Sequence, residues 1–213
     1  QMTSQHIPLS QRLNNFMWFV QNAQMSGDKN VKEAFLEFLK FCMNAEEQLM
    51  EEQELWASVL VGVLDLLKNS RPDHQYLQLS IIAAICKCEK YHHIVKENNG
   101  FQIIIKSLQS INDAVNGEGL SHFSRLIFTA CACLIRFSYS MENKRLIGEL
   151  GGINQLVDLL WRSQSEAVLE RALTALWQLS ICDENKVLIR ECGGIEAVCS
   201  MLKNPNEGVL ENA

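Results

Sequence analysis

The stretch GELGGINQLVDLL, residues 148–160, decides the fold because the glycine pair 151–152 interrupts an otherwise helical pattern of apolar residues. A glycine inside a helix costs roughly 0.5–1 kcal/mol relative to alanine. The same pair returns at residues 193–194 within RECGGIEAVCSML, residues 190–202, again followed by isoleucine. The offset is 42 residues (193 − 151 = 42), which indicates a repeat rather than an isolated loop.

The residues around the glycine pairs repeat as well. ENKRLIGELGGINQLVDLL (142–160) aligns with ENKVLIRECGGIEAVCSML (184–202), and YHHIVKENNGFQIIIKSL (91–108) fits the same template with Asn99 and Gly100 at the glycine pair. A more divergent copy, ASVLVGVLDLL (57–67), has its glycine pair replaced by Ser58 and Val59. The predicted copies are residues 54–90, 91–142, 143–184 and 185–213. We place the additional residues of the second copy in the polar stretch 110–124, and the last copy is incomplete.

Each copy predicts three helices. In the clearest copy they are residues 144–150, residues 153–161 and, after the polar break 162–165, residues 166–182. The third helix carries an apolar stripe that one unit cannot cover alone, so neighbouring copies must stack on it. Its members are Val168, Leu169, Ala172, Leu173, Leu176 and Leu179. Since no strand-like alternation bounded by hairpin turns occurs, we predict an all-α fold.

These features resemble the armadillo repeat family: a period near 42, a glycine pair before isoleucine, and a third helix of the form VLERALTALWQLS. The resemblance is strong over residues 143–213, fair over 54–142 and weak over 1–53. It implies a right-handed α-solenoid whose third helices line a concave groove for extended peptides. Residues 1–53, with amphipathic patterns at 12–24 and 31–42, are expected to form a degenerate repeat or a cap.

The resemblance also indicates where a groove would lie. In importin-α, a member of this family, the third helix carries a Trp and, four residues later, an Asn that holds the peptide backbone. The aligned positions here hold Thr174 and Gln178, Ala132 and Arg136, Ser80 and Ala84. Since that ladder is missing, nuclear-import cargo binding is not expected. Neighbouring positions in the expected groove hold Tyr76, Lys87, Phe128, Tyr139, Glu170 and Ile181.

Single residues in this groove leave alternatives open. Arg136, inside the nearly apolar CACLIRFSYS, must meet solvent, a nearby carboxylate or an acidic partner. Gln178 either clamps a peptide amide or is simply solvated. Phe128 and Tyr139 change between groove and core if the register shifts by one. Large apolar side chains at core-like spacing, Trp161 and Trp177, are expected to pack between helices rather than to bind ligand.

Composition excludes several classes of function. The chain is 47% hydrophobic and 21% charged with a net charge of −6, and without a basic stripe a direct nucleic-acid partner is not expected. The sequence contains no stretch of about 18 consecutive apolar residues, so no membrane span is predicted. No signal peptide is evident. We therefore expect a cytosolic or nuclear protein. The glycine pair lacks the lysine and hydroxyl residue of a phosphate-binding loop.

No catalytic, metal or cofactor site can be assembled from the sequence. Eight cysteines in such a chain are expected to be small buried hydrophobes, because the spacings of Cys86 with Cys88 and of Cys131 with Cys133 point the sulfurs of each pair apart on a helix. The neighbouring histidines 92 and 93 are expected at the surface. The acidic run 45–54 is expected to be a solvated helix face.

The leading functional hypothesis is a noncatalytic scaffold that binds protein or peptide segments in the groove. One alternative is the substrate-recruiting or regulatory armadillo region of a multidomain enzyme such as a ubiquitin ligase. A lipid or metabolite sensor is disfavoured because no contiguous basic cluster occurs. Gln1 at the beginning and the short last copy lead us to expect a segment of a longer solenoid. The oligomeric state stays open.

Overall fold

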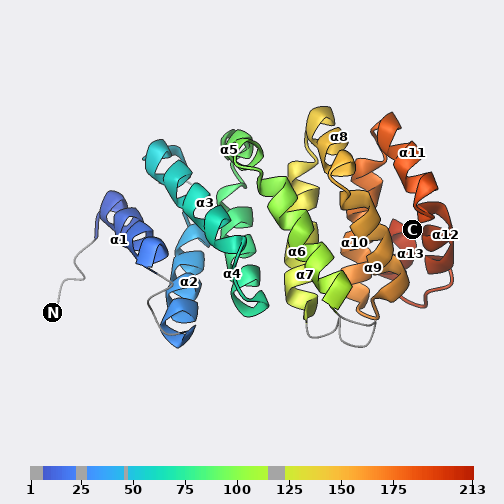
Figure 1. Ribbon diagram of the computed structural model, residues 1–213, viewed down its shortest axis with the longest axis horizontal. Coiled ribbons are helices and arrows are strands. Elements are labelled where there is room, and N and C mark those ends of the chain that lie inside the picture. Colours follow the sequence, from blue (N-terminus) through green and yellow to red (C-terminus); the bar gives the residue numbers. More distant parts are fainter. Residues whose placement is uncertain (1–6, 23–27, 46–47, 115–122) are drawn as a thin grey trace. The chain divides into compact units, whose positions relative to one another are not determined.

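A computed structural model describes residues 7–22, 28–45, 48–114 and 123–213 (Figure 1). Every regular element within these ranges is helical, and they contain no strand. The chain divides into two compact units, Gln1–Asn98 and Asn99–Ala213. The extra residues expected between 110 and 124 fall partly outside the described residues, because 115–122 are not described.

The first unit contains stacked helix pairs. Its elements are α1 (Leu9–Asn22), α2 (Asp28–Met43), the 3-10 turn η2 (Gln48–Met50), α3 (Gln53–Leu67), α4 (Pro72–Ile85), the 3-10 turn η3 (Glu89–Tyr91) and α5 (His92–Glu97). Helix α1 packs on α3, and α2 packs on α4. Phe35 and Trp56 are fully buried between these pairs. The acidic run 45–54 is not one helix face, since η2 and a left-handed residue, Glu52, interrupt it.

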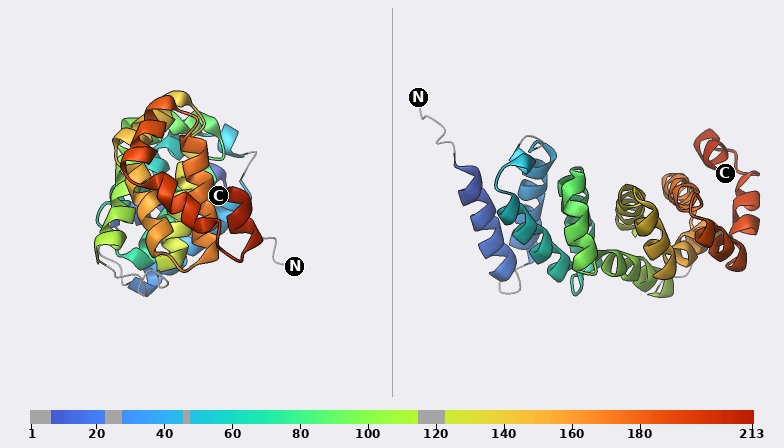
Figure 2. Two further views of the ribbon diagram at one scale, coloured as in Figure 1. Left: turned by 90° about the vertical axis from the view of Figure 1, so that its right-hand side faces the viewer. Right: turned by 90° about the horizontal axis from the view of Figure 1, so that it is seen from above.

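In the second unit, equivalent helices of successive copies stack on one another. Its helices are α6 (Gly100–Ala114), α7 (Ser124–Phe137), α8 (Met141–Glu149), α9 (Gly152–Arg162), α10 (Glu166–Leu179), α11 (Asp183–Glu191), α12 (Gly194–Met201) and α13 (Glu207–Asn212). Helix α7 packs on α10 and α10 on α13, while α6 packs on α9 and α9 on α12. Figure 2 shows this succession in the part of the chain coloured from green to red.

The apolar stripe predicted for the third helix of the clearest copy is confirmed. All six of its members, from Val168 to Leu179, are buried in α10. The helix ends at Leu179 instead of Cys182, because the turn at residues 180–182 leads directly into α11. Helix α10 packs against α9 of the same copy and against α7 of the preceding copy, so burial of its apolar stripe joins the two copies.

The glycine pairs perform separate tasks. Gly151 (φ 84°) and Gly193 (φ 76°) lie in the left-handed region just before α9 and α12, a conformation that only glycine adopts without strain. A Cβ added to Gly152 would lie 2.8 Å from the Ile147 carbonyl oxygen, and one added to Gly194 would lie 2.7 Å from the Ile189 oxygen. The first glycine thus allows the turn, and the second allows the two helices to approach.

The same turn occurs without glycine in the two preceding copies. Asn99 (φ 56°) takes the left-handed position before α6, as the alignment predicts, and Glu52 (φ 47°) takes it before α3. Our placement of the earlier turn at Ser58 and Val59 is wrong, because both residues lie inside α3 and Val59 is buried. Helix α3 has 15 residues where α9 has 11, so its turn lies further toward the N-terminus.

Candidate functional site

The contact between α7 and α10 sets the geometry of the candidate surface. The guanidinium carbon of Arg171 lies 4.7 Å from the centroid of the Phe128 ring, so a residue of α10 lies level with the α7 residue about 43 positions earlier. Phe128 and Ala132 are half-buried along this seam. Both therefore reach the surface from α7, as expected for groove positions.

Large apolar side chains are exposed at the C-terminal ends of these two helices. Trp177 is 64% exposed, Tyr139 is 70% exposed and Ile181 is 51% exposed. Our expectation that Trp177 packs between helices is wrong, because Ala175, Leu176 and Leu179 already fill the inward stripe. Each residue turns a helix by about 100°, which rotates Trp177 outward from Leu176.

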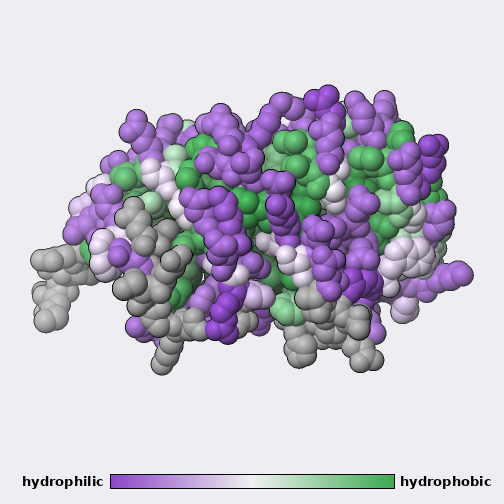
Figure 3. Space-filling view, viewed as in Figure 1, coloured by the Kyte–Doolittle hydropathy of each residue, from purple (hydrophilic) through white to green (hydrophobic). Residues whose placement is uncertain are grey.

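The second tryptophan placed in the core by the sequence is exposed too. Trp161 is 54% exposed near the end of α9, where Leu159 and Leu160 take the buried positions. On the face of the second unit seen in Figure 3, hydrophobic residues reach the surface beside α8 and between α8 and α11. This unit therefore offers more apolar surface than the sequence predicts.

Arg136 and Arg171 supply the positive charge at this seam. Arg136 is exposed and has no hydrogen bond or ion pair within the described residues, and Arg171 lies over the Phe128 ring and likewise has no hydrogen bond or ion pair there. The nearby carboxylates of α10 are directed elsewhere: Glu166 accepts a 2.8 Å hydrogen bond from Asn206, and Glu170 lies against Gly208. Pairing of Arg136 with a neighbouring carboxylate, one of our alternatives, is therefore not observed.

The remaining groove positions of the second unit divide between α13 and solvent. The Thr174 hydroxyl donates to the Glu170 carbonyl oxygen (2.7 Å) and lies 3.0 Å from Oδ1 of Asn212. Thr174 and Glu170 therefore contact the last helix instead of facing an open groove. Gln178 is half-buried and has no hydrogen bond within the described residues, so its amide is available.

The expected groove positions of the first unit lie on and just after α4. Tyr76 and Ser80 are half-buried, and the Ser80 hydroxyl donates to the Tyr76 carbonyl oxygen at 2.6 Å. Lys87 is exposed, whereas Ala84 is only 5% exposed and belongs to the core. The expectation for Ala84 is therefore wrong, since α2 and α3 both pack on α4.

Some polar side chains form hydrogen bonds between successive copies, and these were not predicted from the sequence. The Tyr91 hydroxyl donates to the Leu49 carbonyl oxygen (2.7 Å), and Asn185 donates to the carbonyl oxygens of Lys144 (2.9 Å) and Leu179 (3.0 Å). Desolvation raises the pKa of Tyr91 to about 12. For Asn185, the signal in the sequence was the ENK motif, which occurs at residues 142–144 and again at residues 184–186.

The histidine and cysteine expectations have mixed outcomes. His93 is exposed as predicted, but His92 is buried, with Nε2 2.9 Å from the Cys86 carbonyl oxygen. Cys131 and Cys133 are buried free thiols whose pKa burial raises to about 12. The expectation of buried cysteines is wrong for Cys199, which is exposed, and for Cys88 and Cys192, which are half-buried. Among the described residues, no group of three His, Cys, Asp or Glu side chains is placed to hold a metal ion. None of the helices in the described ranges is long and apolar enough to cross a membrane.

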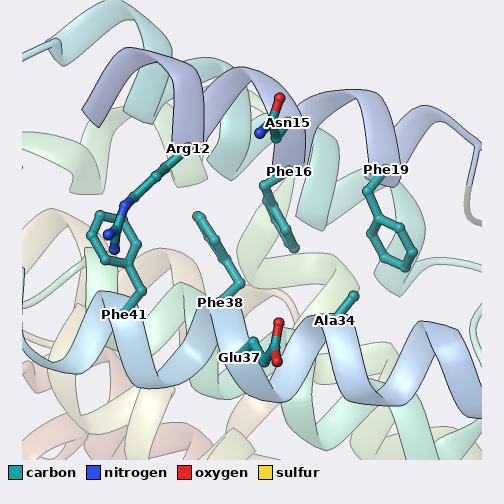
Figure 4. Close-up of a pocket in the computed structure, with 8 residues that line it drawn as sticks. All are labelled: Arg12, Asn15, Phe16, Phe19, Ala34, Glu37, Phe38 and Phe41. Atoms are coloured by element: carbon teal, nitrogen blue, oxygen red, sulfur yellow. The ribbon is translucent and has the colours of Figure 1, made fainter. Parts of the chain in front are cut away.

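A cleft between α1 and α2 in the first unit was also missed. It has a volume of about 350 Å³, and Figure 4 shows side chains from both helices facing each other across it. Phe16 and Phe38 stack with centroids 3.6 Å apart, and the Arg12 guanidinium carbon lies 5.3 Å from the Phe41 centroid. The signal was the spacing i, i+3, i+4, i+7 of the lining residues on each helix.

Comparison with known proteins identifies the repeat. The family model described as Armadillo/beta-catenin-like repeat matches residues 140–181 and 182–213. No curated protein matches the chain.

Solved structures of designed and engineered proteins share the fold. The designed armadillo repeat protein YIII(Dq)4CqI is 20% identical, with 92% of this chain and 78% of that chain covered and a TM-score of 0.74. A second designed armadillo repeat protein, solved with the peptide (KR)4, is 18% identical over 92% of this chain and 77% of that chain, also at 0.74. The engineered protein OR497 is 20% identical, covering 96% of this chain and 48% of that chain, at 0.74. The all-α fold is thus that of armadillo proteins.

Proposed function

Because this chain belongs to the armadillo repeat family, we propose that it is a noncatalytic scaffold that binds extended peptide or protein segments along its third helices. In the second unit, the binding surface is the exposed face of the third helices α7 and α10. One observation carries this proposal: Trp177, Tyr139 and Ile181 are exposed at the ends of these helices, and Arg136 and Gln178 form no hydrogen bond or ion pair within the part of the chain that the structure describes. Apolar surface beside convergent polar groups is typical of a binding site.

The chemistry of these residues suits an extended backbone. The Gln178 amide has a donor and an acceptor, so it can pair with both a backbone carbonyl and an N–H group of the bound segment. Trp177 offers a large, rigid contact surface, and aromatic residues of this kind dominate many interfaces. The backbone of an extended segment must be hydrogen-bonded where binding excludes water, and the Gln178 amide can supply such a hydrogen bond. That a designed armadillo protein was solved with a bound peptide supports the proposal.

Selection of peptides followed by substitution tests this function. Twelve-residue peptides from a random display library are selected on the full chain, and their dissociation constants are measured by calorimetry. We expect Trp177→Ala to weaken binding at least tenfold, because hot-spot aromatic residues contribute about 2 kcal/mol or more. Trp161→Ala is the matched control, since Trp161 is similarly exposed but lies on α9. Equal effects of both substitutions, or no selected peptide, would contradict the proposal.

A further inference from the structure

The cleft between α1 and α2 in the first unit has the features of a small-molecule site. Its volume is about 350 Å³, and side chains from both helices line it (Figure 4). Clefts of this size with mostly aromatic walls and a few polar groups are typical of ligand sites. We propose that this cleft binds a small aromatic carboxylic acid, whose ring contacts the phenylalanines and whose carboxylate is bound by Arg12.

Aromatic side chains form the floor and the ends of the cleft. Phe16 and Phe38 stack across it with centroids 3.6 Å apart, and they are only 6% and 7% exposed. Phe41 and Phe19 lie at its two ends and are half-buried (Figure 4). Aromatic rings attract one another in stacked and edge-to-face arrangements beyond the effect of area alone. The floor therefore favours a ligand with an aromatic ring over one with an aliphatic chain.

Arg12 supplies the charge that selects an acid. Its guanidinium carbon lies 5.3 Å from the centroid of the Phe41 ring, and its side chain has no hydrogen bond or ion pair within the described residues. A guanidinium group over an aromatic ring keeps N–H groups at its edge, and these bind a carboxylate through two parallel hydrogen bonds. The acid group of the ligand would thus lie at the Phe41 end of the cleft.

Glu37 lines the cleft from the opposite helix and carries the opposite charge. It is exposed, and it forms no hydrogen bond or ion pair with any part of the chain that the structure describes. Since Arg12 and Glu37 do not pair with each other, they act separately on a bound acid. Arg12 binds the carboxylate by direct contact, whereas Glu37 repels it through solvent, which screens the interaction. The net preference is therefore for an acid.

The length of the cleft favours a small molecule over a helix of a partner. Its lining residues on α1 run from Arg12 to Phe19, a rise of about 10 Å at 1.5 Å per residue. On α2, the exposed Asn30 and Asn44 lie one turn beyond the two ends of the lining residues. The apolar floor is therefore about two turns long, enough for a two-ring acid. A docked helix would also remove these amides and the charged rim from water, which is costly.

Three naphthalene probes test the inference on the full chain. Naphthaleneacetate, naphthaleneethanol and naphthaleneethylamine share one ring system and differ in charge. Their dissociation constants are measured by ¹H–¹⁵N NMR titration, and we expect the acetate to bind about tenfold more tightly than the alcohol and the amine to bind most weakly. The Trp56 indole signal should shift, because its ring stacks on Phe41 with centroids 5.9 Å apart, while the signal of Trp177 in the second unit stays in place.

Substitutions of exposed residues separate the two charges of the cleft. Arg12→Gln should weaken binding of the acetate about tenfold and leave the alcohol unchanged. Glu37→Gln should tighten binding of the acetate about twofold, because it removes a repelling charge. Lys32→Gln is the matched control, since Lys32 is exposed on α2 but does not line the cleft. It should change the binding of neither probe.

Several results would overturn the inference. They are equal binding of the three probes, equal effects of Arg12→Gln and Lys32→Gln, and a shift of the Trp177 signal with none at Trp56. A concentration-dependent dimer that Arg12→Gln dissociates would assign the cleft to a second copy of the chain and would overturn the inference as well.

Discussion

The two units stack helices in similar ways but stabilise the stacks differently. In the first unit, aromatic rings fill the space between helices, as in the stacked Phe16 and Phe38, and the turn before α3 uses the non-glycine residue Glu52. In the second unit, glycine pairs make the turns before α9 and α12, Asn99 makes the turn before α6, and Asn185 links successive copies through two backbone carbonyl groups. Repeats are visible in sequence where the backbone demands particular residues, and they fade where interchangeable apolar side chains perform the packing.

The largest expected effect removes the aromatic packing of the first unit. Phe38 is 7% exposed, stacks on Phe16 and has its centroid 6.1 Å from that of Trp56. Phe38→Ala should lower the free energy of unfolding by about 3–5 kcal/mol, measured by urea denaturation followed through tryptophan fluorescence. The exposed Met43 on the same helix is the control, and Met43→Ala should change stability by less than about 0.5 kcal/mol. Similar values for both would show that the aromatic stack does not stabilise this unit.

The second unit should instead be sensitive to the glycine turns. Gly152→Ala would place a Cβ 2.8 Å from the Ile147 carbonyl oxygen, whereas a Cβ at Gly151 meets nothing within 4 Å. We expect Gly152→Ala to destabilise the protein by about 1–3 kcal/mol through overpacking. Gly151→Ala should cost about 1 kcal/mol through its positive φ alone. If the same denaturation experiment gave the reverse order, the close approach of α8 and α9 would not explain the second glycine.

The smallest expected effect makes the first unit more like the second. Glu52 has φ 47° and is exposed, so Glu52→Gly should relieve left-handed strain while increasing the entropy of the unfolded chain. The net stabilisation should be about 0.5–1 kcal/mol, read from the urea midpoint. Leu55→Gly, inside α3, is the opposite control and should destabilise. Loss of stability in Glu52→Gly would mean that Glu52 makes contacts that outweigh the strain.

The difference between the two units also explains which parts of the fold could be predicted from the sequence. The glycine turns and the buried stripe of α10 were predictable because they depend on local backbone geometry and on helical periodicity. The turn at Glu52 was not, since glutamate carries no sign of a positive φ and α3 is longer than its counterparts. Burial of His92 depends on a carbonyl group of the preceding helix end, which periodicity does not describe.

The candidate site was predictable only in part. The sequence placed Arg136 in the groove and left open whether it meets solvent, a nearby carboxylate or an acidic partner. In the structure Arg136 is exposed and has no carboxylate partner among the described residues. Trp177 was placed in the core because large apolar side chains are usually buried. Its position one residue after Leu176 already put it outside a complete apolar stripe, so position was a better guide than residue type. The contacts of Thr174 and Glu170 with α13 depend on how the last helix packs, which the sequence pattern does not specify.

The central claim is that the exposed face of the third helices α7 and α10 binds an extended segment, and the indole N–H signals of the four tryptophans test it most directly. Two-dimensional ¹H–¹⁵N NMR of the full chain would be recorded during titration with a peptide selected from a random library. We predict that the Trp177 signal shifts as peptide is added, while the signals of the buried Trp56 and of Trp161 on α9 stay in place. Movement of the Trp161 signal with no change at Trp177 would contradict the claim.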